Sequence, residues 1–105
     1  MILAIDFDDV LCDSRNVKQG FKMGEPVDGA IDAMRLLKSK GHLLVIHTVR
    51  GNRPEHVEKW LDHFGIPYDE VTDLKPSADL YIDDKGLRFE TWALTMPLLK
   101  AIQAI

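Results

Sequence analysis

The sequence predicts an α/β fold with a mainly parallel sheet, on the basis of three observations. Apolar runs typical of buried strands alternate with segments whose apolar residues recur at helical spacing. Their order is strand, helix, strand, helix, strand, strand, which is the alternation of α/β proteins. Three of the apolar runs end directly at a polar region containing Asp6, Thr48 or Asp83. Because parallel sheets bind ligands at the carboxyl ends of their strands, we expect these residues to meet in one crevice.

The first half of the chain is expected to form two buried strands around one helix. Ile and Leu dominate the first apolar run, and Ala30, Ile31, Met34 and Leu37 follow helical spacing. The expected elements are the strand Met1–Ile5, a loop or flap from Asp8 to Pro26, a helix from Val27 with a C-cap at Gly41, and the strand Leu43–Ile46, which runs into His47 and Thr48.

The second half is expected to add one more helix, two short strands and a helical tail. Pro54 follows an Arg-rich loop and suits a helix start, while Gly65 and Pro67 close the segment. The expected elements are a helix with the inward stripe Val57, Trp60, Leu61 and Phe64, strands near Glu70–Thr72 and Leu80–Ile82, and a tail from Phe89 to Ile105 that ends in a helix with Leu98, Leu99, Ile102 and Ile105 on one side.

Composition and charge limit the function classes. A length of 105 residues with 46% hydrophobic and 29% charged residues predicts a single globular domain over 1–105. The net charge of −4 gives no long-range attraction for nucleic acid or an acidic membrane. Cys12 is the only cysteine, so neither a disulfide framework nor a cysteine metal site is expected. No signal peptide or membrane-spanning segment is recognisable, and we expect a cytoplasmic protein.

The strongest functional signal is a group of acidic residues directly after the first apolar run. Asp6, Asp8 and Asp9 place three carboxylates within four positions. Crowded like charges raise one another's pKa and repel unless a cation neutralises them. Mg²⁺ is the usual cation, since it binds one or two carboxylates together with a substrate phosphate. The cluster predicts a metal-assisted phosphoryl-transfer site.

Other residues complete this site. Asp6 is the expected nucleophile, and Asp8 is the expected general acid and base. Mg²⁺ would be held by Asp6, Asp8 and the acidic pair that follows the apolar run Leu80–Ile82. Thr48 would offer its hydroxyl and its backbone N–H to a phosphate oxygen, with Lys75 as a point charge and Arg50 as a substrate contact. The acidic pair is Asp83 and Asp84, with Asp83 favoured as the direct ligand.

These residues resemble the haloacid dehalogenase-like (HAD) phosphatase superfamily in order, residue type and placement. Asp6-Phe-Asp8-Asp9-Val10 resembles its first motif, Thr48 its second, Lys75 its third, and Asp83-Asp84 its fourth. The resemblance implies a Rossmann-like three-layer fold and a Mg²⁺-dependent phosphoric monoester hydrolase that forms an aspartyl-phosphate on Asp6. It also implies metal ligation by the carboxylates of Asp6 and Asp83 and by the backbone carbonyl of Asp8, with Asp84 as an outer partner.

The segment from Thr48 to Trp92 is also similar to small members related to polynucleotide kinase-phosphatase domains. Family enzymes usually carry an inserted cap domain, and the intervals here are too short for one. A capless member of the family acts on a bulky substrate or uses a neighbouring subunit as its lid. A homo-oligomer is therefore kept as an alternative to a monomer. The substrate is expected to be a small phosphorylated compound of the sugar phosphate or nucleotide class. The net negative charge of the chain disfavours long nucleic acid as a substrate.

Two other functions are considered. A receiver-type signalling domain also combines acidic residues, Thr and Lys around Mg²⁺, but it phosphorylates an Asp at the end of a middle strand, and the run Leu43–Thr48 lacks a carboxylate. A catalytically silent binding module is the second alternative. Individual residues also have structural interpretations: Asp9 as a solvated loop residue, Cys12 as a small buried residue, and His47, which alternation turns away from Thr48, as a core or interface histidine.

Overall fold

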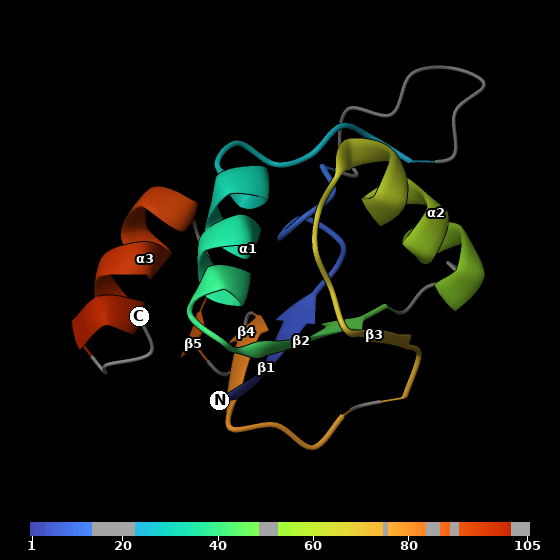
Figure 1. The fold of residues 1–105 in the computed structure, drawn as a ribbon. Helices are drawn as coiled ribbons and strands as arrows, with labels where there is room; N and C mark the ends of the chain where they lie inside the picture. Colours follow the sequence, from blue (N-terminus) through green and yellow to red (C-terminus); the bar gives the residue numbers. More distant parts are fainter. Residues whose placement is uncertain (14–22, 49–52, 75, 84–86, 89–90, 102–105) are drawn as a thin grey trace.

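A five-stranded parallel sheet forms the centre of the molecule in the computed structural model (Figure 1). The structure describes residues 1–13, 23–48, 53–74, 76–83, 87–88 and 91–101, with the backbone alone at 87, 88 and 101. Within these residues the strand order is β3-β2-β1-β4-β5, and every neighbouring pair is parallel. The strands are β1 (Ile2–Asp6), β2 (Leu43–His47), β3 (Glu70–Thr72), β4 (Leu80–Asp83) and β5 (Leu87–Arg88).

Helices cover one face of this sheet, as Figure 1 shows. They are α1 (Ala30–Ser39), α2 (Pro54–Phe64) and α3 (Trp92–Ala101). Alternate strand residues turn toward the helices and are fully buried, because successive side chains of a strand point to opposite faces. The sheet's contribution to this core includes Leu3, Ile5, Leu44, Ile46 and Ile82, each with 0% exposure.

The irregular connection between β3 and β4 passes along the opposite face of the sheet, on the side away from the helices (Figure 1). The Tyr81 hydroxyl donates to the carbonyl of Pro76 at 2.7 Å and accepts the N–H of Ala78 at 3.2 Å. Asp79 accepts the N–H of Ile2 through Oδ2 at 2.6 Å. Helices, sheet and this connection make three layers, so the predicted Rossmann-like α/β fold with a parallel sheet is confirmed.

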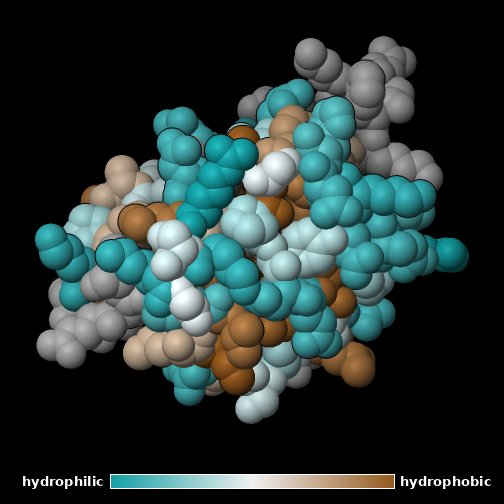
Figure 2. Space-filling view, in the orientation of Figure 1, coloured by the Kyte–Doolittle hydropathy of each residue, from teal (hydrophilic) through white to brown (hydrophobic). Residues whose placement is uncertain are grey.

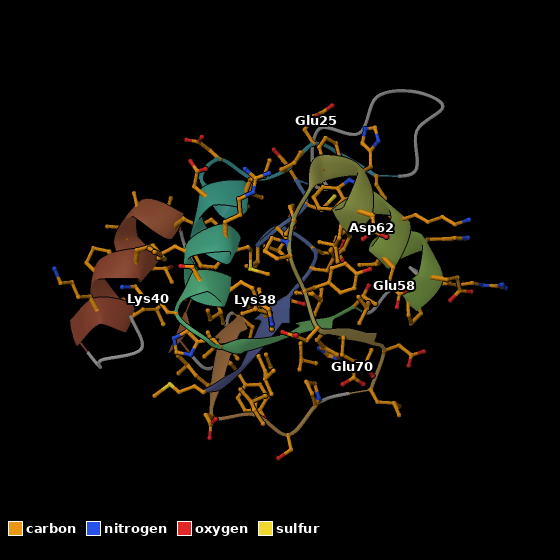
Figure 3. The ribbon with its side chains drawn as sticks, viewed as in Figure 1. Glu25, Lys38, Lys40, Glu58, Asp62 and Glu70 are labelled. Atoms are coloured by element: carbon orange, nitrogen blue, oxygen red, sulfur yellow. The ribbon has the colours of Figure 1, made fainter. Side chains whose placement is uncertain are left out.

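Asp69 fixes β2 to the helical layer. Its Oδ1 accepts from Lys38 Nζ at 2.5 Å, and its Oδ2 accepts the backbone N–H of Leu44 at 2.7 Å. These hydrogen bonds, with Lys38 first, hold the pKa of the Asp69 carboxyl below its ordinary value. Figure 3 labels Lys38 at the end of α1 nearest β2. One carboxylate thus connects α1, β2 and the segment that precedes β3.

Apolar side chains of the described residues remain exposed in three places. Met1, Ile2, Leu43 and Leu74 lie near the start of the sheet strands and the β3–β4 connection, and hydrophobic residues gather there along the lower part of Figure 2. Leu94 and Leu98 are exposed on α3, and Leu36 is exposed on α1. None of the helices in the described ranges has the length and apolar character needed to cross a membrane.

The helical tail differs from the prediction. The sequence predicts Leu98 and Leu99 on one side of the helix, but Leu98 is 48% exposed and Leu99 is fully buried. Adjacent helical residues are about 100° apart, so only one of the two can face the core. Trp92, Thr95 and Leu99 form the buried side of α3 instead. Ile102 and Ile105 lie outside the described residues, and the two-residue strand β5 was not predicted.

Candidate active site at the switch point of the sheet

Asp6 and Asp83 lie side by side where the strand order reverses. From β1 the chain proceeds to β2 and β3 on one side, while β4 and β5 lie on the other. Asp6 ends β1 and Asp83 ends β4, and the register Ile5↔Ile82 makes the two aspartates the next neighbours. In open parallel sheets the crevice outside the strand ends at such a reversal is the usual ligand site. The predicted placement of both residues at the carboxyl edge is confirmed.

A compact turn after β1 brings Asp8 back toward this edge. Phe7 is fully buried, and its N–H lies 3.0 Å from the carbonyl oxygen of His47 and 3.2 Å from Asp6 Oδ1. Its carbonyl accepts the N–H groups of Leu11 and Cys12, both at 3.0 Å. The chain therefore folds over within five residues, and Asp8 is half-buried with a solvent-shielded Oδ2 atom.

Two tryptophans hold the segment that follows. Trp92 Nε1 donates to the carbonyl of Val10 at 3.1 Å, and Trp60 Nε1 donates to the carbonyl of Gly24 at 2.9 Å. The Trp60 ring also meets the Phe7 ring edge to face, with centroids 5.1 Å apart. Indole N–H groups seek a partner when buried, so these bonds fix α2 and α3 to the two ends of the loop that carries Asp8.

The carboxylates influence one another. Burial, followed by the charge of Asp8, raises the pKa of Asp6 from 3.8 to about 6, and Asp83 contributes in the same direction. The positive charge of His47 and the N–H of Phe7 act against this rise. The crowding predicted from the sequence is therefore present at Asp6. An uncompensated carboxylate of this kind is typical of a site that a cation or a substrate completes.

Thr48 is positioned as predicted, but one of its two expected contacts is not available. Its side chain is fully buried directly after β2, and its Oγ1 has no hydrogen-bond partner among the described residues. Buried hydroxyls are nearly always paired, so this oxygen is suited to an absent ligand. The backbone N–H, however, donates to the carbonyl of Thr72 at 3.0 Å. The prediction that this N–H binds phosphate is wrong, because β3 already uses it.

Three predicted site residues, Arg50, Lys75 and Asp84, lie outside the described residues. The structural interpretations of two others agree with the structure. Asp9 is exposed in a turn with φ of 62°, a conformation that Asp tolerates better than most residues. Cys12 is buried, and burial raises the pKa of its thiol to about 11, so it is a packed residue with little thiolate character.

His47 lies beside Asp6, which the sequence does not predict. It does turn away from Thr48, yet it is half-buried at the strand end and forms the cross-strand pair of Asp6. Its charge reaches Asp6 strongly enough to lower that residue's pKa. The alternation of side chains along β2, taken alone, predicts that His47 is a core or interface histidine. The missing information was the register between β1 and β2, which places His47 on the same face of the sheet as Asp6.

Comparisons with known proteins identify the fold alone. No protein-family model matches the chain, and no curated protein matches it. Among solved structures, the chain is similar to a conserved protein from Bacteroides thetaiotaomicron, with a TM-score of 0.72 and 23% sequence identity. The match covers 98% of this chain and 92% of that one. The arrangement of nearly the whole chain is therefore also found in that protein.

Proposed function

We propose that this protein is a Mg²⁺-dependent phosphatase that hydrolyses a phosphate monoester through an aspartyl-phosphate on Asp6. The observation that carries the proposal is the convergence of Asp6, Asp8 and Asp83 at the switch point of a parallel sheet, with their charges coupled at Asp6. The HAD-like motif order in the sequence supports the same function.

The electrostatics of the site call for a cation. A phosphate dianion about 3.5 Å from a carboxylate is repelled by roughly 9 kcal/mol at an effective dielectric constant of about 20. Bound Mg²⁺ would supply Lewis-acid stabilisation by neutralising this repulsion and polarising the phosphoryl oxygens. The oxygen donors at this edge are the type that Mg²⁺ prefers.

The proposed ligands are the carboxylates of Asp6 and Asp83 and the backbone carbonyl of Asp8, with Asp84 as an outer partner. The described residues contain no group of three or more His, Cys, Asp or Glu side chains arranged to hold a metal. The proposal requires only two carboxylates with one carbonyl, because Mg²⁺ commonly keeps several water ligands. The donor set therefore fits in chemical type, and Asp84 lies outside the described part of the chain.

The reaction proceeds in two steps. An Asp6 carboxylate oxygen attacks phosphorus, the bond from phosphorus to the leaving oxygen breaks, and Asp8 gives its proton to that oxygen. Asp8 then takes a proton from water as the water attacks the aspartyl-phosphate, which releases inorganic phosphate and restores Asp6. The buried Thr48 hydroxyl donates to a phosphoryl oxygen, and Lys75 and Arg50 supply positive charge from their loops.

The strand order supports a phosphatase over a receiver-type signalling domain. Receiver sheets have the order 2-1-3-4-5, in which the first strand lies between the second and third. Here β1 lies between β2 and β4. The lifetime of the phosphorylated protein separates the two functions directly: a phosphatase hydrolyses its aspartyl-phosphate within a turnover, whereas a receiver retains it.

We propose a sugar phosphate or a nucleotide as the substrate. No inserted cap domain is present in the described ranges. The site therefore accepts a substrate whose bulk extends beyond the strand ends, or a neighbouring subunit of a homo-oligomer closes it.

Hydrolysis of an aryl phosphate, followed by a panel of sugar phosphates and nucleotides, tests the proposal. Asp6→Asn should abolish Mg²⁺-dependent turnover, and EDTA should abolish that of the wild type. Asp9→Asn is the matched control, since it removes an exposed carboxylate from the same turn and should keep wild-type activity. Undiminished turnover in Asp6→Asn would exclude the mechanism, and a wild type inactive on the whole panel would favour a silent binding module.

A further inference from the structure

A row of polar residues crosses the carboxyl edge of the sheet on one face. The register pairs Asp6 with His47 and His47 with Thr72, and Asp83 follows on the other side of Asp6. Paired residues of neighbouring strands share a face, so the row runs Asp83, Asp6, His47, Thr72. All four side chains are half-buried.

Asp6 is therefore placed between unlike neighbours. On the β4 side lies another carboxylate, that of Asp83. On the β2 side lies the imidazole of His47. A carboxylate only accepts hydrogen bonds, whereas an imidazole N–H donates one, so the two neighbours offer the Asp6 oxygens different partners.

We propose that His47 is a positioning residue for the nucleophile, holding the Asp6 carboxylate from the β2 side while Asp83 and a cation occupy the β4 side. This role rests on the proposed phosphatase function. The imidazole supplies an N–H donor to the face that Asp6 occupies, and orientation of a nucleophile to within a fraction of an ångström strongly affects rate. Nothing in the role requires contact between His47 and the substrate.

His47 is the member of the row that is suited to this task and accessible to a clean test. Thr72, the other uncharged member, already uses its Oγ1 to accept the N–H of Leu74 at 3.1 Å. The hydrogen bond from the Phe7 N–H to His47, at 3.0 Å, is accepted by the backbone carbonyl of His47 and does not involve its side chain. A change at position 47 therefore removes the imidazole while leaving the hydrogen bond that begins the turn after β1.

The experiment compares His47→Leu and His47→Gln in the full chain, with p-nitrophenyl phosphate and Mg²⁺. His47→Leu should lower kcat by about tenfold or more and leave KM within about twofold, because positioning acts on the transition state. His47→Gln retains an N–H donor and should recover a large part of the loss. His63→Leu is the matched control, since His63 is exposed on α2, and it should behave as the wild type.

A double-mutant cycle between His47→Leu and Asp6→Asn, measured by urea unfolding without metal, gives a second readout that needs no turnover. If His47 holds Asp6, the effect of Asp6→Asn on the unfolding equilibrium constant should differ by about threefold or more between the two backgrounds. Additive effects, or an unchanged kcat in a folded His47→Leu, would overturn the proposal. If the two substitutions are coupled but the wild type shows no turnover, the proposed phosphatase function is rejected and the interaction between His47 and Asp6 is retained.

Discussion

Asp6→Asn should stabilise the metal-free protein at neutral pH while it abolishes activity. Burial and the charge of Asp8 raise the pKa of Asp6 from 3.8 to about 6, so ionising this group costs the folded state free energy. At about 1.36 kcal/mol per pKa unit the full cost is about 3 kcal/mol. Because the side chain is only half-buried, solvent screens part of this, and we expect a gain of about 1–2 kcal/mol.

The sign of the pH dependence follows from proton linkage. Below pH 3.8 both states of the wild type hold the Asp6 proton, and the group does not affect stability. Between 3.8 and about 6 the folded state binds more protons than the unfolded state, so stability falls as the pH rises. Above a pH of about 6 the folded state carries the whole free-energy cost of ionising Asp6. Asparagine carries no such cost, so its advantage should be large at about pH 7.5 and small at about pH 4.

Urea unfolding followed by circular dichroism, in EDTA, measures this effect at both pH values. Asp9→Asn is the control for loss of one charge from the same turn and should show no comparable gain at neutral pH. Mg²⁺ should then stabilise the wild type more than Asp6→Asn, since a ligand of the folded state adds stability only where it binds. An Asp6→Asn variant that is equally stable or less stable than the wild type at about pH 7.5 would refute the reasoning.

Three further changes test other parts of the structure. Thr48→Val replaces a buried hydroxyl that has no described partner, and should raise the thermal midpoint by an amount equivalent to about 1 kcal/mol while phosphatase activity falls; a lower midpoint would contradict this. Gly24→Ala would place a Cβ against the backbone oxygen of Asp13 and should destabilise the protein by about 2 kcal/mol in urea unfolding. A variant as stable as the wild type would contradict this expectation. Asp69→Ala removes the partner of the Leu44 N–H and should cost about 1–2 kcal/mol at neutral pH. Because the Asp69 pKa is lowered on folding, this loss should shrink as the pH falls below the unfolded value, and a pH-independent loss in the same titration would contradict the account.

The sequence was informative where one local pattern determined the outcome. Asp6 and Asp83 each follow an apolar run, and a parallel sheet necessarily brings such run ends to one edge. The strand Glu70–Thr72 and the helix start at Pro54 were likewise predicted at their observed positions. These features depend on residues adjacent in the chain, and therefore appear in a single sequence.

Features that depend on pairing between distant segments could not be predicted in the same way. The N–H of Thr48 is used by Thr72 because β3 pairs with β2, and the place of His47 beside Asp6 depends on the register of β1 with β2. The exposure of Leu98 depends on the rotation of α3 about its axis, and the sequence leaves this rotation undetermined because most residues of the helix are hydrophobic.

The most direct test of the account is the site of covalent phosphorylation during turnover. The wild type would be mixed with an aryl phosphate and Mg²⁺, quenched in acid within a turnover, digested, and mapped by mass spectrometry. A phosphoryl group on the peptide that contains Asp6, absent from Asp6→Asn, is the predicted result. Steady turnover with no phosphorylated aspartate, or with the group on another residue, would contradict the central claim.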